Sequence, residues 1–102
     1  MNFLKDKNYF FKKNPDLNKI SYSVLNQTYT KIYDEPFDWN KLNTFDDLDY
    51  IEFIMTIEHD LDIIINDDVS DFFQKDNNLK KIFDTHTYRE EVLKDLLYFT
   101  ES

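Results

Sequence analysis

Four aspartates, Asp60, Asp62, Asp67 and Asp68, lie close together in the sequence and could bind a metal ion. Carboxylates at such spacing bind calcium in loops, but a calcium loop also needs a central glycine and a terminal glutamate. The sequence contains no glycine, and no glutamate follows this cluster at the required position. We therefore expect no metal site here beyond weak, adventitious binding of divalent ions.

Other common catalytic groups are also poorly placed. His59 and His86 have no second histidine at metal-binding spacing, so surface positions are expected for both. Ser21, Ser23 and Ser70 have no evident base partner. Without cysteine there is no thiolate nucleophile, and without glycine there is no familiar phosphate-binding loop. The sequence therefore predicts a protein that is not an enzyme and carries no cofactor.

Size and composition favour one folded domain. The chain has 102 residues, of which 41% are hydrophobic and 18% aromatic, so it is too apolar for a disordered acidic segment. No apolar run approaches the roughly 20 residues of a membrane span, and the N-terminus lacks the apolar core of a signal peptide. We expect a cytoplasmic protein with no membrane contact. The abundance of Asn, Lys, Ile and Phe indicates an AT-rich genome.

Charge is distributed unevenly along the chain. Residues 1–33 carry six lysines and two aspartates, a net charge of +4, whereas residues 34–102 carry a net charge of −13. Ten acidic residues and no basic residue occur between Thr44 and Asp71. Such a surface repels nucleic acid and anionic membranes and attracts basic patches on proteins. Direct nucleic-acid binding is therefore not expected.

The hydrophobic periodicity predicts helices only. Asn14 and Pro15 form a typical helix start, and a first helix is predicted at 15–33. Residues 34–43 read as a long loop whose Phe37, Trp39 and Leu42 pack on the core. Further helices are predicted from about Asp46, at 67–74 after an Asn66 cap, and at 88–99, where Thr87 and Glu90 match a capping box and Val92, Leu93, Leu96 and Phe99 share a face. The expected architecture is all-α, a bundle of three longer helices and one short one at 14–102, preceded by an N-terminal extension at 1–13.

The helix that starts near Asp46 has two apolar faces. At 100° per residue, one face carries Phe53, Ile54, Ile57 and Leu61, and the roughly opposite face carries Leu48, Ile51 and Met55. Only one face is needed for the core of a small domain. The second is either covered by another part of the chain or is a surface that binds a partner, because apolar residues rimmed by charge are typical of interfaces.

The stretch "DDLDYIEFIMTIEHDLDIIINDD", residues 46–68, resembles the acyl carrier protein signature D-S-L-D-x-V-E-L-V-M-x-L-E-x-x-F-x-I-x-I-P-D-E without gaps. The resemblance covers about a quarter of the chain closely; the remainder agrees only in the order of the helices. It implies an acyl-carrier-like four-helix bundle with a short third helix. The residues identical to common residues of the family are Leu48, Asp49, Glu52, Met55, Glu58, Ile63, Ile65 and Asp67.

One departure from the signature concerns the prosthetic group. The family attaches 4'-phosphopantetheine to a serine hydroxyl, and Asp47 stands at that position. A carboxylate would form only a labile acyl phosphate, so the resemblance implies a carrier that has lost its arm. Two explanations of Asp47 remain open. It either pairs with Thr44 as a helix cap, where an acid stabilises the first turn, or it keeps part of the negative charge of the lost phosphate.

The resemblance also implies where partners bind. Family partners place Arg and Lys patches on the acids of the second helix and apolar residues on its exposed stripe. The residues expected to contact a partner protein are Asp46, Asp47, Leu48, Asp49, Ile51, Glu52, Met55 and Glu58. The expected function is that of a non-catalytic adaptor, or of a structural subunit in a larger complex, that recognises a basic patch.

Two alternatives to a partner-binding adaptor remain. In the first, the N-terminal segment covers Leu48 and Met55 with the side chains of Phe3, Leu4, Phe10 and Phe11, and no binding face is left. In addition, the carboxylates are able to imitate a row of phosphates, which would make the protein an acidic inhibitor or nucleic-acid mimic that blocks a basic site.

Overall fold

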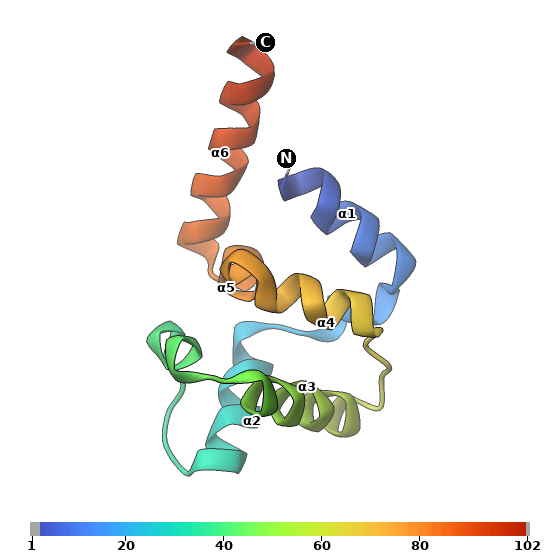
Figure 1. Ribbon diagram of the computed structural model, residues 1–102, viewed down its shortest axis with the longest axis vertical. Coiled ribbons are helices and arrows are strands. Elements are labelled where there is room, and N and C mark those ends of the chain that lie inside the picture. The colour runs from blue at the N-terminus through green and yellow to red at the C-terminus, as the bar shows by residue number, and fades with distance from the viewer. Residues whose placement is uncertain (1–2, 102) are drawn as a thin grey trace.

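The computed structural model describes residues 3–101, with side chains to residue 97, and these residues form helices and loops without a strand. The all-α prediction is therefore confirmed. Figure 1 shows α3 at one end of the molecule, α4 and α5 in the middle, and α1 and α6 at the other end. The elements are α1 (Phe3–Lys13), η1 (Pro15–Lys19), α2 (Tyr22–Tyr33), η2 (Trp39–Thr44), α3 (Asp47–Leu61), α4 (Asp67–Gln74), η3 (Lys75–Asn77), α5 (Asn78–Phe83) and α6 (Thr85–Glu101).

Helix α3 begins with a true capping box. The Asp46 side chain accepts a hydrogen bond from the Asp49 backbone, and the Asp49 side chain accepts one from the Asp46 backbone. This arrangement satisfies two backbone N–H groups at the helix start. The expected pair of Thr44 and Asp47 is wrong, because the Thr44 hydroxyl instead donates to the Lys41 carbonyl. The helix ends at Asp62, whose left-handed conformation (φ 53°) stops the helical hydrogen-bond pattern.

The predicted first helix at 15–33 is wrong, because the structure divides this segment in two. Residues 15–19 form only the 3-10 helix η1, and Ile20 is extended and buried. Ser21 then caps α2 by accepting a hydrogen bond from the Val24 backbone. Burial of Ile20 and the local cap at Ser21 together outweigh the helical spacing of the apolar residues.

The core lies between α2, α3 and α4 and is rich in aromatic rings. Phe53 and Ile57 of α3, together with Phe73 of α4, are completely buried. Residues 34–43, predicted as a loop, include most of the 3-10 helix η2. The predicted packing is confirmed: Phe37 and Leu42 are buried, and Trp39 is half-buried with its ring 5.3 Å from that of Phe37. The core therefore holds α3 by its inner face only.

The second half of the chain contains one more helix than predicted. Helix α4 has the predicted limits of 67–74, but α5 follows it after Asp76 and Asn77 adopt left-handed conformations. The last helix starts at Thr85 rather than at 88. The predicted capping box of Thr87 is wrong, because Thr87 lies inside the first turn and its hydroxyl donates to the Asp84 carboxylate.

The segment predicted as an N-terminal extension is the helix α1, which packs on the second half of the chain. The Phe10 ring lies 4.6 Å from that of Phe72 in α4, and the Leu4 backbone N–H donates to the Asp95 carboxylate of α6. Beyond this contact α6 continues away from the other helices, which lengthens the molecule to 46 Å (Figure 1). The radius of gyration, 14.1 Å, accordingly exceeds the value of about 13 Å typical of a compact chain of this size.

Candidate functional site

The outer face of α3 presents a row of exposed apolar side chains. Leu48, Ile51 and Met55 are 74%, 52% and 61% exposed, respectively, and they follow one another along one side of the helix. Large apolar side chains grouped in this way on a small domain mark a candidate interaction surface.

This row lies in a shallow groove between α3 and α2. The groove has a volume of about 470 Å³, and the residues that line it are Lys31, Leu48, Ile51, Glu52, Met55, Thr56 and His59. Lys31 of α2, Thr56 and His59 were not predicted as site residues. Thr56 and His59 share the helix with the apolar row, but no signal in the sequence placed Lys31 beside it. We name this surface the α3 groove.

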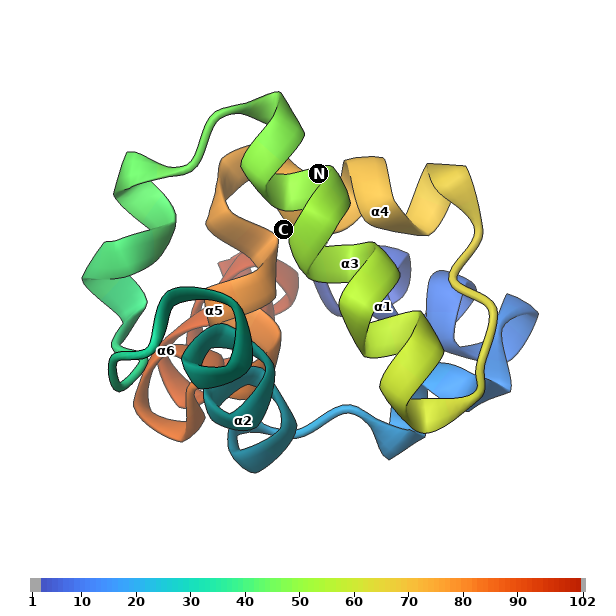
Figure 2. The ribbon, with the colours of Figure 1, turned by 90° about the horizontal axis from the view of Figure 1, so that it is seen from below.

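The N-terminal residues do not cover the α3 groove. Phe10 packs on Phe72, and the Phe11 ring lies 6.4 Å from that of Phe83. Figure 2 shows α1 behind α3, on the far side of the molecule, and in Figure 1 α4 lies between the two helices. The alternative in which the N-terminal segment covers Leu48 and Met55 is therefore wrong.

A second groove begins on the other side of Ile51, between α3 and α4. It has a volume of about 550 Å³ and is lined by Asp47, Tyr50, Ile51, Ser70, Asp71, Gln74 and Lys75. Because Ile51 lines both grooves, the two form neighbouring hollows on one surface. Ser70 and Tyr50 are the hydroxyl-bearing residues that line this second groove together with Asp47.

Asp47 occupies the first turn of α3 and is exposed. Its carboxylate Oδ1 accepts a hydrogen bond of 2.8 Å from the Gln74 side-chain amide, at the last residue of α4. An acid in this turn also interacts favourably with the helix dipole. Asp47 thus connects two helices through its side chain. Its negative charge remains at the surface.

Glu58 and Asp49, like Asp46 and Asp47, are predicted partner-binding acids that accept hydrogen bonds within the chain. Glu58 is half-buried, and its Oε2 accepts a hydrogen bond of 3.0 Å from the Ile65 backbone, which fixes the loop between α3 and α4. Asp49 belongs to the capping box and lies 3.5 Å from the Tyr33 hydroxyl. These two residues therefore stabilise α3, whereas Glu52 lines the α3 groove directly.

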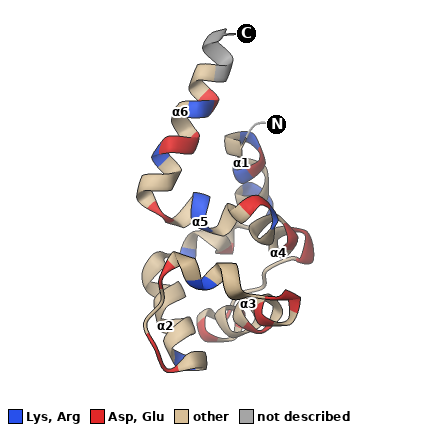
Figure 3. Ribbon diagram, turned by 60° about the vertical axis from the view of Figure 1, so that its left-hand side comes forward, with Lys and Arg blue, Asp and Glu red and all other residues tan. Residues whose placement is uncertain are grey.

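The charges around α3 are almost all negative. Figure 3 shows acidic residues on α3 and α4, and basic residues on α1. Lys31 is the basic residue nearest the groove; it forms an ion pair of 2.8 Å with Asp60, and this hydrogen bond lowers the pKa of Asp60. Lys13 of α1 pairs with Asp68 of α4, at 2.7 Å, and not with an acid of α3.

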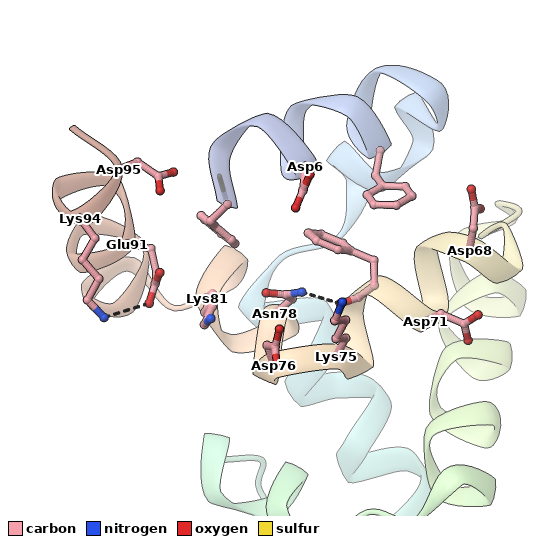
Figure 4. Close-up of a pocket in the computed structure, with 13 residues that line it drawn as sticks. Asp6, Asp68, Asp71, Lys75, Asp76, Asn78, Lys81, Glu91, Lys94 and Asp95 are labelled. Carbon is pink, nitrogen blue, oxygen red and sulfur yellow. Dashed lines mark hydrogen bonds and ion pairs between the residues drawn. The ribbon is translucent and has the colours of Figure 1, made fainter. Parts of the chain in front are cut away.

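A third hollow lies between α1, α4 and α6 and was not predicted. Its volume is about 660 Å³, and Phe3, Phe10 and Phe72 form its apolar part. In Figure 4, Glu91 and Asp95 point from α6 into this cleft. Glu91 pairs with Lys94 at 3.4 Å, and Asp95 accepts the Leu4 N–H. Three lysines, Lys75, Lys81 and Lys94, are interspersed among the acids of the lining. The lining therefore offers no row of charges of one sign for a ligand.

The described residues contain no group of three or more His, Asp or Glu side chains placed to hold a metal ion. His86 lies at the surface with its Nε2 3.1 Å from Glu90. None of the helices at residues 3–101 combines the length and apolar content needed to cross a membrane. The surface features that stand out are thus grooves and exposed apolar rows.

Comparison of the chain with protein-family models, with curated proteins and with solved structures finds no match.

Proposed function

We propose that this protein is a non-catalytic, acidic interaction module that binds a basic patch on a partner protein through the α3 groove. The observation that carries this proposal is the row of Leu48, Ile51 and Met55, exposed on a helix that has no Lys or Arg. Exposing three large apolar side chains in a row has a cost in solubility, and a partner that covers them removes that cost.

The apolar row supplies most of the binding energy in this proposal. Full burial of a Leu, Ile or Met side chain contributes roughly 1.5–3 kcal/mol. An exposed ion pair contributes at most about 1 kcal/mol, so Asp46, Asp47 and Glu52 act chiefly by steering a basic partner and fixing its orientation.

The resemblance to acyl carrier proteins is part of the proposal. The helix α2, a long connection that contains η2, the helix α3 and the short helix α4 follow one another along the chain, which agrees with the order expected for that family. The proposed acyl-carrier-like bundle includes α2, α3 and α4. Asp47 at the position of the family's serine is the reason to propose an adaptor without a prosthetic group, either alone or as a subunit of a larger complex.

Affinity capture with matched variants tests the proposal. The bait proteins are the wild type, Met55→Asp and Ile64→Asp; Ile64 is 72% exposed but does not line the α3 groove, so both variants receive the same charge at an exposed apolar position. We expect Met55→Asp to lose the partner and Ile64→Asp to retain it.

A salt series in the same experiment separates an adaptor from a nucleic-acid mimic. A mimic binds through charge, so its complex weakens steeply with added salt and tolerates Met55→Asp. An adaptor that depends on apolar contact shows the reverse. Retention of the same partner by Met55→Asp, with release by salt, would overturn the proposal.

A further inference from the structure

Helix α6 places two acids, beside the half-buried Tyr88 and Val92, toward the rest of the chain and exposes three leucines to solvent. Glu91 and Asp95 line the cleft against α1, and Asp95 is buried there (Figure 4). Leu93 and Leu97 each follow one of these acids by two residues, which places them about 200° away around the helix. They are 58% and 59% exposed. The sequence predicted that Val92, Leu93, Leu96 and Phe99 share one face; Val92 is half-buried, Leu93 and Leu96 are exposed, and the Phe99 side chain lies outside the described residues.

The exposed leucines form a row suited to another helix. Leu93 and Leu97 are four residues apart, so they lie one above the other on the helix surface, and the exposed Leu96 lies beside them. Leucines at spacings of three and four residues form the seam of paired helices. The helix has 17 residues and a length of about 25 Å, and it runs beyond α1 in Figure 1, so that its outer side is open to a second helix.

The net charge of α6 favours a second copy of the chain as the partner that binds the exposed leucines. Between Thr85 and Leu97, Arg89 and Lys94 oppose three acids, so the segment has a net charge of only −1. Helix α3, by contrast, carries five acids and no Lys or Arg. A basic partner is therefore attracted more strongly to α3 than to α6. A second copy of this acidic chain is repelled at α3 but meets little repulsion at α6.

We propose that two copies of the chain associate through the leucine face of α6, with the two helices antiparallel. The same row then meets itself across a two-fold axis, the usual geometry of a homodimer. Apart from α1, which lies beside α6 and contacts it as far as Asp95, the other helices lie at the N-terminal end of α6 (Figure 1). The antiparallel arrangement therefore separates two bodies that are each negatively charged, whereas a parallel arrangement brings them together. This dimer is independent of the proposed function of α3.

Measurement of the mass in solution tests the dimer with matched variants. The wild type is expected to approach twice 12.5 kDa as its concentration rises, by light scattering or sedimentation. The double variant Leu93→Glu, Leu97→Glu should remain a monomer. The control Leu48→Glu, Met55→Glu adds the same charge to the other exposed apolar row and should still dimerise.

Three results would overturn the proposal. The first is a wild type that stays monomeric at every concentration. The second is a Leu93→Glu, Leu97→Glu variant that dimerises like the wild type. The third is a control that loses the dimer as well, since this would assign the loss to added charge. Circular dichroism of each variant confirms that the helices are retained.

Disulfide cross-linking tests the antiparallel arrangement, because the natural chain contains no cysteine. An antiparallel pair places position 93 of one copy near position 97 of the other. A mixture of the Leu93→Cys and Leu97→Cys proteins should therefore cross-link faster than either protein alone. Faster linkage of each protein with itself would indicate a parallel pair and contradict this part of the proposal. Ile64→Cys, in the loop after α3, serves as the control for random collision.

Discussion

The side-chain amide of Gln74 donates a hydrogen bond of 2.8 Å to the carboxylate of Asp47, which joins the last turn of α4 to the first turn of α3. The contact spans 27 residues of sequence. It gives Asp47 a structural role that differs from the helix cap predicted from Thr44. The cap itself is formed by the neighbouring Asp46.

The two neighbouring aspartates should therefore differ in their effect on stability. Asp46→Ala removes the capping side chain and should reduce the free energy of unfolding by about 1 kcal/mol. Asp47→Ala removes one exposed hydrogen bond and should cost less than about 0.5 kcal/mol. Chemical denaturation of both variants measures the difference, and a larger loss for Asp47→Ala than for Asp46→Ala would contradict this assignment.

Asp47 also determines the covalent state of the protein in our proposal. Incubation with coenzyme A and a phosphopantetheinyl transferase should leave the wild type unmodified in intact-mass spectrometry. Asp47→Ser provides the missing hydroxyl at the same place and should gain the adduct if the transferase recognises the surface of α3. An adduct on the wild type, at Thr44 or elsewhere, would contradict the loss of the prosthetic group.

The inner and outer faces of α3 should respond differently to truncation. Phe53→Ala removes a completely buried ring that packs on Phe37 and Phe45, leaves a cavity and should cost about 3–5 kcal/mol. Leu48→Ala removes an exposed side chain and should change stability by no more than about 0.5 kcal/mol. Thermal or chemical unfolding checks both values, and similar losses for the two variants would indicate that Leu48 is covered.

Tyr29 should make the protein sensitive to alkaline pH. Burial, together with a hydrogen bond from its hydroxyl to Glu35, raises the pKa of Tyr29 from 10.0 to about 12. In the unfolded chain this hydroxyl ionises near its ordinary pKa, so its contribution to stability is complete below pH 10 and is lost as the pH rises to about 12.

The free energy of unfolding, measured across this pH range together with the phenolate absorbance, reports the loss of the stability contributed by Tyr29. Tyr29→Phe has no ionisable hydroxyl and should lose less stability between pH 10 and 12 than the wild type does. An equal loss in the two proteins would exclude Tyr29 as the cause. Burial also raises the pKa of Tyr33 and of Tyr50, and these two residues account for a remaining decrease in the variant.

The sequence was sufficient to predict the helix at α3 and its two faces. Phe53 and Ile57 recur at helical spacing, and burial of that face enforces the period. The exact cap was not predictable, because Thr44, Asp46 and Asp47 are all acceptable capping residues. Which one acts depends on where the preceding 3-10 helix η2 ends.

The breaks and orientations of the other helices depend on tertiary contacts. Asp76 and Asn77 adopt left-handed conformations. Glycine is the clearest sequence signal for such a conformation, and this chain contains none. The orientation of α6 follows from the contact of Asp95 with the Leu4 backbone, 91 residues away. Sequence periodicity places Leu93 on an apolar face but does not determine whether that face points inward.

Site-specific photo-cross-linking from α3 tests the central claim most directly. A photoreactive side chain placed at Ile51, where the two grooves meet, should capture a protein partner with a basic surface. The same group placed at Ile64, which lies outside both grooves, should not capture it. Identical capture from both positions, or capture from Ile51 of only a second copy of this chain, would contradict the claim that α3 is the surface recognised by a partner protein.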